Sequence, residues 1–399
     1  MTSDLFARTR TLFEIPDGVI YLDGNSLGVM PKAARERVIT ELDVSWGREL
    51  IRAWNTCGWI DLPSKIGDRI ATLIGAPPGS VVVADSTSIN LYKALTSALQ
   101  LSGDRRVILS DSGNFPTDLY VAEGVIRTLD RGLSLKIVAP EDIEAAIDAD
   151  VAVLMLTEVD YRTGRMHDMA RLTARAQAAG ALTIWDLAHS CGALPVDLTG
   201  ANADFAIGCS YKYLNGGPGA PAFIYVRPDH QPKIQPALSA WMGHAAPFAF
   251  PLNYTPAPAI DRMRTGTPPV LSLAALDSAL TVWDGISMQD VRQRSMELSD
   301  LFIARVEALC PELELASPRD ATKRGSQVSF RFHEGYAAMQ ALIADNVIGD
   351  FRAPDIMRFG FTPLYIGFAE VEEAARRLAR IISENRWDRP EFKARSKVT

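Results

Sequence analysis

The sequence predicts an α/β fold: a large domain with a mainly parallel sheet between helices, plus a smaller α+β domain. From about residue 80 to residue 226, short apolar runs alternate with helix-like stretches, an order that is typical of strand–helix–strand units. After residue 270 the pattern changes to long helix-like stretches around an alternating strand. At 399 residues, the chain is long enough for two domains.

The predicted strands of the large domain are short and apolar, as expected for strands that are buried on both faces. They are residues 81–84, 106–109, 135–138, 151–156, 181–185, 204–210 and 222–226. Helices are expected over 89–101 and 169–179. A glycine-rich turn joins the last two strands, which predicts a hairpin there.

The second half of the chain predicts loops followed by a helical domain. Residues 228–269 are rich in proline, aromatic and small residues, so we expect them to form loops over the site. The later elements are expected at 271–283, 288–309 and 370–385 as helices and at 327–332 as a strand. The expected division is a segment 1–50 associated with the small domain, a large domain 51–275 and a small domain 276–399.

Composition excludes several classes of protein. The formal net charge of −7 and the absence of a basic stripe argue against a nucleic-acid partner. No apolar stretch reaches the length of a membrane helix, and the first residues lack a signal-peptide core, so no membrane partner is expected. The four cysteines are scattered without paired metal-ligand spacing, which predicts no metal site and a cytoplasmic protein.

An aspartate and a lysine each follow one of the predicted strands. Asp186 follows 181–185, and Lys212 follows 204–210 before a glycine-rich turn. Buried parallel strands deliver such side chains to the carboxyl edge of the sheet. A lysine there can form a Schiff base with pyridoxal phosphate, and an acid can keep the pyridine nitrogen protonated. The pair predicts this cofactor, against the alternatives of a surface lysine and a turn aspartate.

Hydroxyl groups at a helix start predict the phosphate end of the site. Asp85-Ser-Thr-Ser88 follows a strand and opens the helix, where free N–H groups favour an anion. The alternative is a plain N-cap.

Three further side chains are weaker candidates. Phe115, held by the proline that follows it, offers a flat surface for a pyridine ring, or else ordinary core packing. His189 fits over the face of that ring, in a hydrogen bond to Asp186, or as a structural histidine. Arg358, before Phe-Gly-Phe, is either a bidentate clamp for a substrate carboxylate or a solvated arginine on an edge strand.

Together these motifs resemble the kynureninase family, which belongs to the aspartate-aminotransferase-like fold type I of pyridoxal-phosphate enzymes. The resemblance spans almost the full length of the chain. It rests on residues 21–28 (Tyr-Leu-Asp-Gly-Asn-Ser-Leu-Gly), 85–91, 114–118, 186–189 and 211–212. The sequences Gly-Asn-Ser-Leu-Gly and Phe-Pro-Thr-Asp are its most specific parts.

The resemblance implies roles for individual residues. Lys212 would hold the cofactor, Asp186 would pair with the pyridine nitrogen, and Tyr211 would be a third catalytic group that moves protons. The cofactor shell would comprise Thr87, Ser88, Phe115, Pro116, Thr117, Asp118, Thr157, Asp186, His189, Tyr211, Lys212, Trp241 and Thr267. Arg358 would bind the substrate's α-carboxylate, and Trp54 is a candidate for the pocket around the aryl ring.

The implied reaction is the hydrolytic cleavage of the Cβ–Cγ bond of L-kynurenine or 3-hydroxy-L-kynurenine. Its products are anthranilate or 3-hydroxyanthranilate and L-alanine, in tryptophan catabolism and NAD biosynthesis. A homodimer is implied, in which Trp241 and Thr267 reach the phosphate of the partner subunit. The alternatives are a cysteine desulfurase or selenocysteine lyase, and an aminotransferase. The first needs a reactive cysteine on a mobile loop of the C-terminal half, where only Cys310 occurs.

Overall fold

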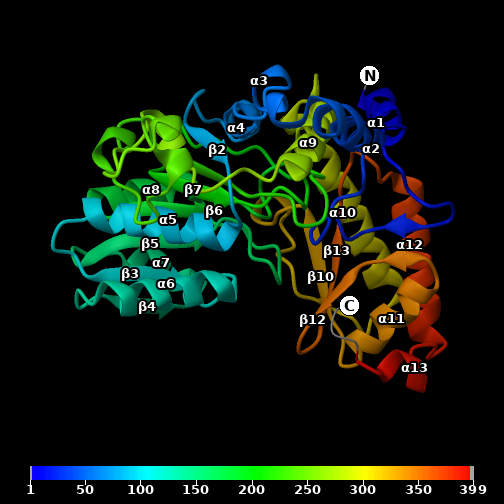
Figure 1. Ribbon diagram of the computed structural model, residues 1–399. Helices are drawn as coiled ribbons and strands as arrows, with labels where there is room; N and C mark the ends of the chain where they lie inside the picture. The colour runs from blue at the N-terminus through cyan, green and yellow to red at the C-terminus, as the bar shows by residue number, and fades with distance from the viewer. Residues whose placement is uncertain (1, 396–399) are drawn as a thin grey trace.

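The computed structural model describes residues 2–395, and its larger part contains a seven-stranded sheet (Figure 1). The strand order is β2-β8-β7-β6-β5-β3-β4. Four pairings, β7–β6, β6–β5, β5–β3 and β3–β4, are parallel, whereas β8 is antiparallel to both β7 and β2. The mainly parallel sheet and the predicted hairpin of its last two strands, β7 and β8, are therefore confirmed. The strands are β2 (Val81–Val83), β3 (Val107–Asp111), β4 (Ser134–Val138), β5 (Val151–Thr157), β6 (Leu182–Asp186), β7 (Phe205–Gly208) and β8 (Phe223–Val226).

Helices cover both faces of this sheet because successive strand residues point to opposite sides. In β5, Leu154 and Leu156 join the core that includes α4 and α8, while Val153 and Met155 join the core that includes α5 and α6. All seven residues of β5 are buried. The helices of this part are α3 (Ala53–Thr56), α4 (Leu62–Leu73), α5 (Thr87–Leu101), α6 (Pro116–Leu129), α7 (Ile143–Ala146) and α8 (Met169–Ala178).

A smaller antiparallel sheet forms the other part of the molecule, in the order β12-β13-β10-β9. An aromatic cluster binds it to helix α10, where the ring centre of Phe302 lies 4.8 Å from that of Phe359 and 6.2 Å from that of Phe330. The strands of this sheet are β9 (Glu314–Leu315), β10 (Gln327–Arg331), β12 (Asp350–Arg352) and β13 (Ile356–Gly360), and β11 (Val347–Ile348) lies in a separate two-stranded sheet. The helices are α10 (Met288–Leu309), α11 (Gly335–Ala344), α12 (Phe368–Ser383) and α13 (Pro390–Lys393).

The N-terminal segment lies against this smaller part. Strand β1 (Ile20–Tyr21) pairs in parallel with β11, and α1 spans Thr2–Arg10. The division into segments 1–50, 51–275 and 276–399 stays a prediction, and residues 1 and 396–399 lie outside the described residues.

The predicted elements of the second half are found in the structure. Several short strands that the structure also contains were not predicted. Helix α10 has the predicted bounds, and the element expected at 271–283 is helix α9 (Val270–Ala279) with a 3₁₀ turn after it. Strands β11, β12 and β13 escape sequence reasoning because they hold two to five residues each. Charged residues such as Asp350 and Arg352 also interrupt their apolar pattern.

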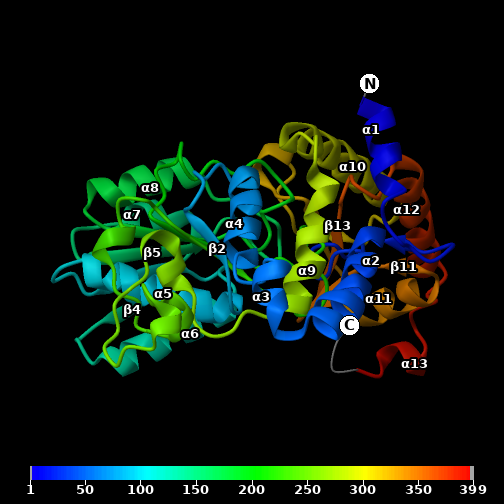
Figure 2. The same ribbon diagram turned by 45° about the horizontal axis from the view of Figure 1, so that its top comes forward.

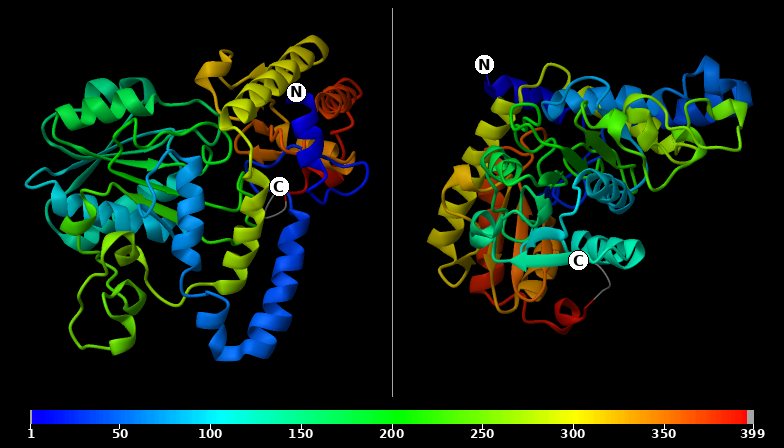
Figure 3. Two further views of the ribbon diagram at one scale, coloured as in Figure 1. Left: turned by 90° about the horizontal axis from the view of Figure 1, so that it is seen from above. Right: turned by 90° about the vertical axis from the view of Figure 1, so that its left-hand side faces the viewer.

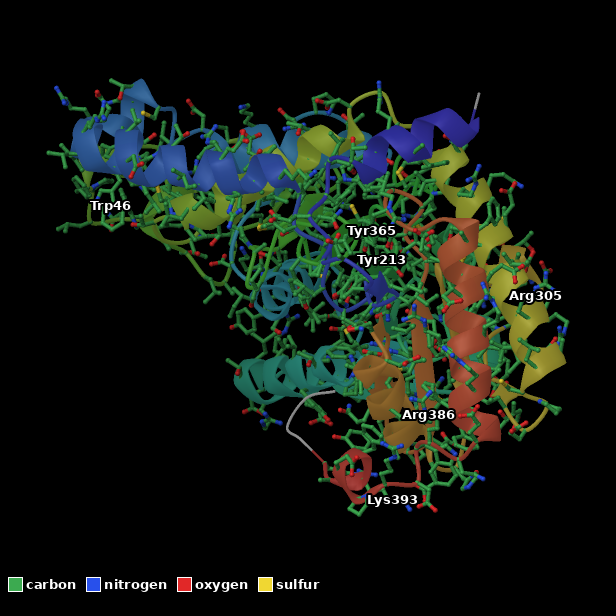
Figure 4. The ribbon with its side chains drawn as sticks, turned by 90° about the vertical axis from the view of Figure 1, so that its right-hand side faces the viewer. Trp46, Tyr213, Arg305, Tyr365, Arg386 and Lys393 are labelled. Atoms are coloured by element: carbon green, nitrogen blue, oxygen red, sulfur yellow. The ribbon has the colours of Figure 1, made fainter. Side chains whose placement is uncertain are left out.

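One elongated arm projects from the body of the molecule. Helix α2 (Lys32–Thr40), which lies beside α9 (Figure 2), continues into a π-helical segment, Glu41–Glu49. That segment ends in an arm away from the sheets, as the left view of Figure 3 shows. Trp46 lies near the end of this arm (Figure 4), and its side chain is 57% exposed.

Within residues 2–395, no single helix is long and apolar enough to cross a membrane. The bent pair Val270–Trp283 and Met288–Leu309 meets the length and composition criteria only when taken together. No group of three or more histidine, cysteine, aspartate or glutamate side chains suited to a metal ion occurs in this described part of the chain.

A close backbone contact joins the N-terminal segment to the turn that carries Lys212. The N–H of Gly28 donates to the carbonyl of Tyr211 over 2.8 Å. A Cβ atom at Gly28 would lie 2.2 Å from the carbonyl oxygen of Lys212 and 2.8 Å from the Cα of Asn215. Only glycine therefore fits between the two segments.

We predict that Gly28→Ala lowers the free energy of unfolding by roughly 2 kcal/mol, because the added methyl group pushes backbone against backbone. Chemical denaturation measures the change. Gly124→Ala, in helix α6 and with its nearest neighbouring atom at 4.0 Å, is the matched control and should be neutral or slightly stabilising. Equal stability of the Gly28→Ala variant and the wild type would contradict the contact.

Candidate active site

A cavity of about 310 Å³ opens at the carboxyl edge of the large sheet. Thr157 and Asp186 are the last residues of the neighbouring strands β5 and β6, and they face each other in the strand register. Ten residues that the sequence predicts for the cofactor line this cavity: Thr87, Ser88, Phe115, Thr117, Asp118, Thr157, Asp186, His189, Tyr211 and Lys212. Their meeting follows from the parallel strands, whose carboxyl ends share one edge.

Two carboxylates, Asp118 and Asp186, are buried together in the cavity. Burial raises the pKa of Asp118 well above its usual range, and the charge of Asp186 raises it further. Burial also raises the pKa of Asp186, an effect that the charge of Lys212 opposes. One oxygen of Asp186 accepts a hydrogen bond from the N–H of Ala188 at 2.7 Å. Asp186 therefore also stabilises the turn after its strand, which was the alternative role considered for it. The Oδ2 atom of Asp118 is buried without a hydrogen-bond partner.

The partner of His189 is the lysine. Its Nε2 atom lies 2.9 Å from the Nζ atom of Lys212, so the predicted alternative of a hydrogen bond to Asp186 is wrong. Burial lowers the pKa of His189 far below its usual range, and the charge of Lys212 lowers it further. The imidazole is therefore neutral and accepts a hydrogen bond from the ammonium group, while its buried Nδ1 atom has no partner.

The start of helix α5 forms one end of the cavity. Ser86 caps the helix by accepting the N–H of Ile89, and Thr87 is the first helical residue. Asp85 directly before them has φ of +52°, a left-handed turn. Because Ser86, Thr87 and Ser88 all line the cavity, the first turn of the helix, where amide groups lack partners within the helix, lies at its wall. The Ser86 cap is therefore confirmed, while the anion site at the same helix start stays a prediction.

A hydrogen-bond chain fixes Phe115 above the strand ends. Asn114 accepts the backbone N–H of Phe115 at 2.7 Å and the hydroxyl of Thr157 at 2.5 Å. The Phe115 ring is 42% exposed and meets Tyr161 edge-on, with ring centres 5.1 Å apart. Core packing of Phe115 is thus excluded, and its ring is available to a ligand. Pro116 starts helix α6 behind it and does not line the cavity.

Three predicted residues lie elsewhere in this chain. Trp54, Trp241 and Thr267 line a separate cavity. No residue of segment 228–269 lines the cavity of Lys212, so the prediction of loops over the site is wrong for a single chain. The segment consists of short 3₁₀ turns and connecting loops.

Arg358 is neither solvated nor on an edge strand. It lies on β13, between β12 and β10, with 1% of its surface exposed. Its Nε atom donates to Asp350 at 2.6 Å, and its Nη2 atom to the same carboxylate and to Ser26. Its Nη1 atom donates to the carbonyl of Tyr161. Nε and Nη2 together already bind the carboxylate of Asp350. The predicted bidentate clamp for a substrate carboxylate is therefore not available in this arrangement.

Sequence reasoning missed Tyr161 and Asp350. Tyr161 lines the cavity, four residues beyond the end of β5. A polar aromatic residue shortly after a buried strand was the available signal. Asp350 gave no such signal, because its pairing with Arg358 depends on the register between β12 and β13.

Comparison with known proteins identifies the family. A kynureninase from Pseudomonas fluorescens is 51% identical to this sequence, with 99% of this chain and 97% of the relative covered. One from Burkholderia pseudomallei (strain 1106a) is 49% identical over the same shares. The chain belongs to the kynureninase family. The model of the kynureninase C-terminal domain matches residues 291–378, which run from helix α10 to helix α12.

The kynureninase relatives show that the chain is an enzyme. Solved structures show that it has the fold of fold type I. A cysteine desulfurase from Thermococcus onnurineus NA1 superposes with a TM-score of 0.79 at 19% identity, over 95% of this chain and 98% of its own. A cysteine desulfurase from Escherichia coli gives the same values. At this identity the likeness concerns the fold alone.

A buried acid, Glu158, lies next to the cavity residue Thr157. Glu158 follows Thr157, and its N–H donates to the carbonyl of Asp186 at 3.0 Å. Burial raises the pKa of Glu158 to about 7. Between about pH 4.5 and pH 7 the native state holds a proton that the unfolded state has released, so stability falls as the pH rises through this window and levels off above it.

We predict that Glu158→Gln removes this fall, which is on the order of 3 kcal/mol. Urea denaturation at a series of pH values measures it. Glu36→Gln, at an exposed position, is the control and should keep the wild-type profile. If the wild-type and Glu158→Gln profiles are parallel between pH 5 and pH 7, Glu158 does not carry a raised pKa.

Proposed function

We propose that this chain is a pyridoxal-phosphate-dependent hydrolase that cleaves the Cβ–Cγ bond of L-kynurenine or 3-hydroxy-L-kynurenine. The products are L-alanine and anthranilate or 3-hydroxyanthranilate. The observation that carries the proposal is the roughly half identity to kynureninases over 99% of the chain. The cavity that holds Lys212, Asp186 and His189 supports it.

The charges of the cavity fit a protonated pyridine ring. Two buried carboxylates, Asp118 and Asp186, face a single ammonium group, that of Lys212, while His189 is neutral. A second cation would let both acids ionise, and a pyridinium N–H is such a cation. The unpartnered Oδ2 atom of Asp118 is a further acceptor beside Asp186. These two acids would hold the pyridine nitrogen.

The remaining residues fit the other parts of the cofactor. Thr87 and Ser88, with the amide groups at the start of α5, would hold the phosphate. Phe115 would stack on the ring from one side and His189 from the other, with Thr157, Thr117 and Tyr211 around its edge. Lys212 would carry the cofactor through a Schiff base.

When bound, pyridoxal phosphate supplies an electron sink for the bond-breaking steps. Lys212 would take the α-proton of the substrate and return it as general base and acid. Its hydrogen bond to the neutral His189, at 2.9 Å, would keep the amine aimed into the cavity. Tyr211 is next to the lysine, with its ring centre 5.9 Å from Nζ. Its hydroxyl group is the proposed carrier of protons for the addition of water to the γ-ketone.

Arg358 would bind the substrate's α-carboxylate from the far side of Tyr161. The bond from its Nη1 atom to the Tyr161 carbonyl places this atom behind the wall of the cavity. Hydrogen bonds to Asp350 and Ser26 hold the guanidinium group in one orientation. A substrate carboxylate would therefore meet Nη1 in a single charge-assisted hydrogen bond.

A second copy of the chain would complete the site. Trp54, Trp241 and Thr267 gather in a cavity that Lys212 does not share. Large apolar side chains are exposed close by in the chain, among them Ile51 at 77% and Phe250 at 70%. Exposed apolar surface of this size is typical of an interface. In a homodimer, Trp241 and Thr267 would reach the phosphate of the partner, and Trp54 would contribute to the aryl pocket.

Within residues 2–395, the C-terminal half has no thiol that is placed for cysteine desulfurase chemistry. Cys310, the cysteine of the C-terminal half, is fully buried at the end of α10. Burial raises its pKa to about 12, so its thiolate is scarce near neutral pH and cannot reach a substrate. This supports hydrolysis over sulfur transfer.

The test is the release of fluorescent anthranilate, or its 3-hydroxy analogue, from each substrate in the presence of pyridoxal phosphate. We predict turnover by the wild type without any added keto acid, which an aminotransferase would require. Lys212→Ala should lower kcat by about a thousandfold or more, because the base and the Schiff-base amine are lost together.

Lys65→Met is the control for the loss of a lysine. Lys65 lies on α4, and its ammonium group pairs with Asp277 outside the cavity, so this variant should keep the wild-type rate. Turnover that survives in Lys212→Ala, or that needs a keto acid in the wild type, would overturn the proposed function.

A further inference from the structure

A buried ion pair lies beneath the start of helix α5. The Nζ atom of Lys93 is 2.8 Å from Oδ2 of Asp85 and 2.6 Å from the carbonyl oxygen of Met263. The Lys93 side chain is fully buried, whereas that of Asp85 is 23% exposed. A fully buried lysine is rare in proteins unless it is paired, and none of the roles proposed above uses this one.

Asp85 is the member of the pair that reaches the cavity. It lines the same space as Thr87 and Ser88, and its left-handed turn sets the direction of the helix start. Its second oxygen, Oδ1, accepts the hydroxyl of Thr265 at 2.7 Å. Both carboxylate oxygens are thus held, one by Lys93 from the helix that follows and one by Thr265 from a distant segment, which fixes the turn.

This arrangement places a carboxylate at the end of the cavity that would receive a phosphate dianion. Like charges at such a distance in a partly buried site repel each other. The ammonium group of Lys93 lies on the inner side of Asp85 and balances its charge. Without the Lys93 ammonium group, the carboxylate of Asp85 would repel the phosphate that this turn is proposed to bind.

We propose that Lys93 and Asp85 are positioning residues for the cofactor phosphate: Asp85 shapes the turn, and Lys93 cancels its charge. The proposal rests on the proposed function, since it takes pyridoxal phosphate as the ligand. It deepens that function by assigning an electrostatic role to a helix residue that does not touch the ligand.

The test compares two ligands that differ only in the phosphate, pyridoxal phosphate and pyridoxal. Equilibrium dialysis of the cofactor-free full-length chain gives Kd for each, without any need for turnover. The proteins are the wild type, Lys93→Met, Asp85→Asn and the double variant, with Lys65→Met as the control for a lysine paired outside the cavity.

For Lys93→Met we expect Kd for pyridoxal phosphate to rise about tenfold or more, and Kd for pyridoxal to change less than about threefold. Asp85→Asn in the same background removes the uncompensated charge. The double variant should therefore return to within about threefold of the wild-type ratio of the two constants. A purely structural role of the pair would instead weaken both ligands in parallel, and the second substitution would rescue nothing.

The outcomes separate this inference from the proposed function. If the wild type binds pyridoxal phosphate but Lys93→Met leaves the ratio of the two constants unchanged, the inference is overturned and the proposed function stands. If the wild type binds neither ligand, both fail. Should Lys93→Met not fold, the double variant decides the matter, because a ratio more than about tenfold from that of the wild type contradicts charge balance.

Discussion

Two acids, Asp118 and Asp186, share one buried space with the ammonium group of Lys212 at the carboxyl edge of the large sheet. Burying Asp118 and Asp186 beside a single ammonium group costs free energy that packing alone does not return. The local structure limits this cost through the N–H of Ala188 on Asp186 and through the charge of Lys212. Two buried carboxylates beside one ammonium group would be stabilised by a further cation. The protonated ring of pyridoxal phosphate, the proposed cofactor, would supply one, and this would link the electrostatics of the site to its chemistry.

The rest of the fold holds this charge arrangement in place from three regions of the chain. The sheet aligns Thr157 with Asp186 through the β5–β6 register, and the N-terminal segment fits against the lysine turn at Gly28. The smaller sheet brings Arg358 behind Tyr161, with Asp350 opposite it in the register of β12 and β13. The site is therefore a property of the whole chain, which agrees with relatives that match over 99% of its length.

The sequence predicts the strands and the residues that follow each of them. It does not predict contacts that depend on how two strands align with each other. Continuous apolar runs marked the buried strands. The polar residues that follow them, such as Asp186 and Lys212, meet in one cavity because parallel strands end at one edge of the sheet. The pairing of Arg358 with Asp350 could not be predicted, since it depends on how short charged strands align. Lys93 lies within an apolar helix, where its sequence neighbours do not reveal which carboxylate it meets.

The central claim is that Lys212, among the lysines of this chain, is the group that carries the cofactor. Borohydride reduction of the cofactor-loaded protein, followed by digestion and mass spectrometry of the peptides, tests it directly. The account predicts that the reduced cofactor is attached to Lys212 and to no other lysine. Attachment to a different lysine, or no attachment in a protein that binds pyridoxal phosphate and turns over substrate, would contradict it.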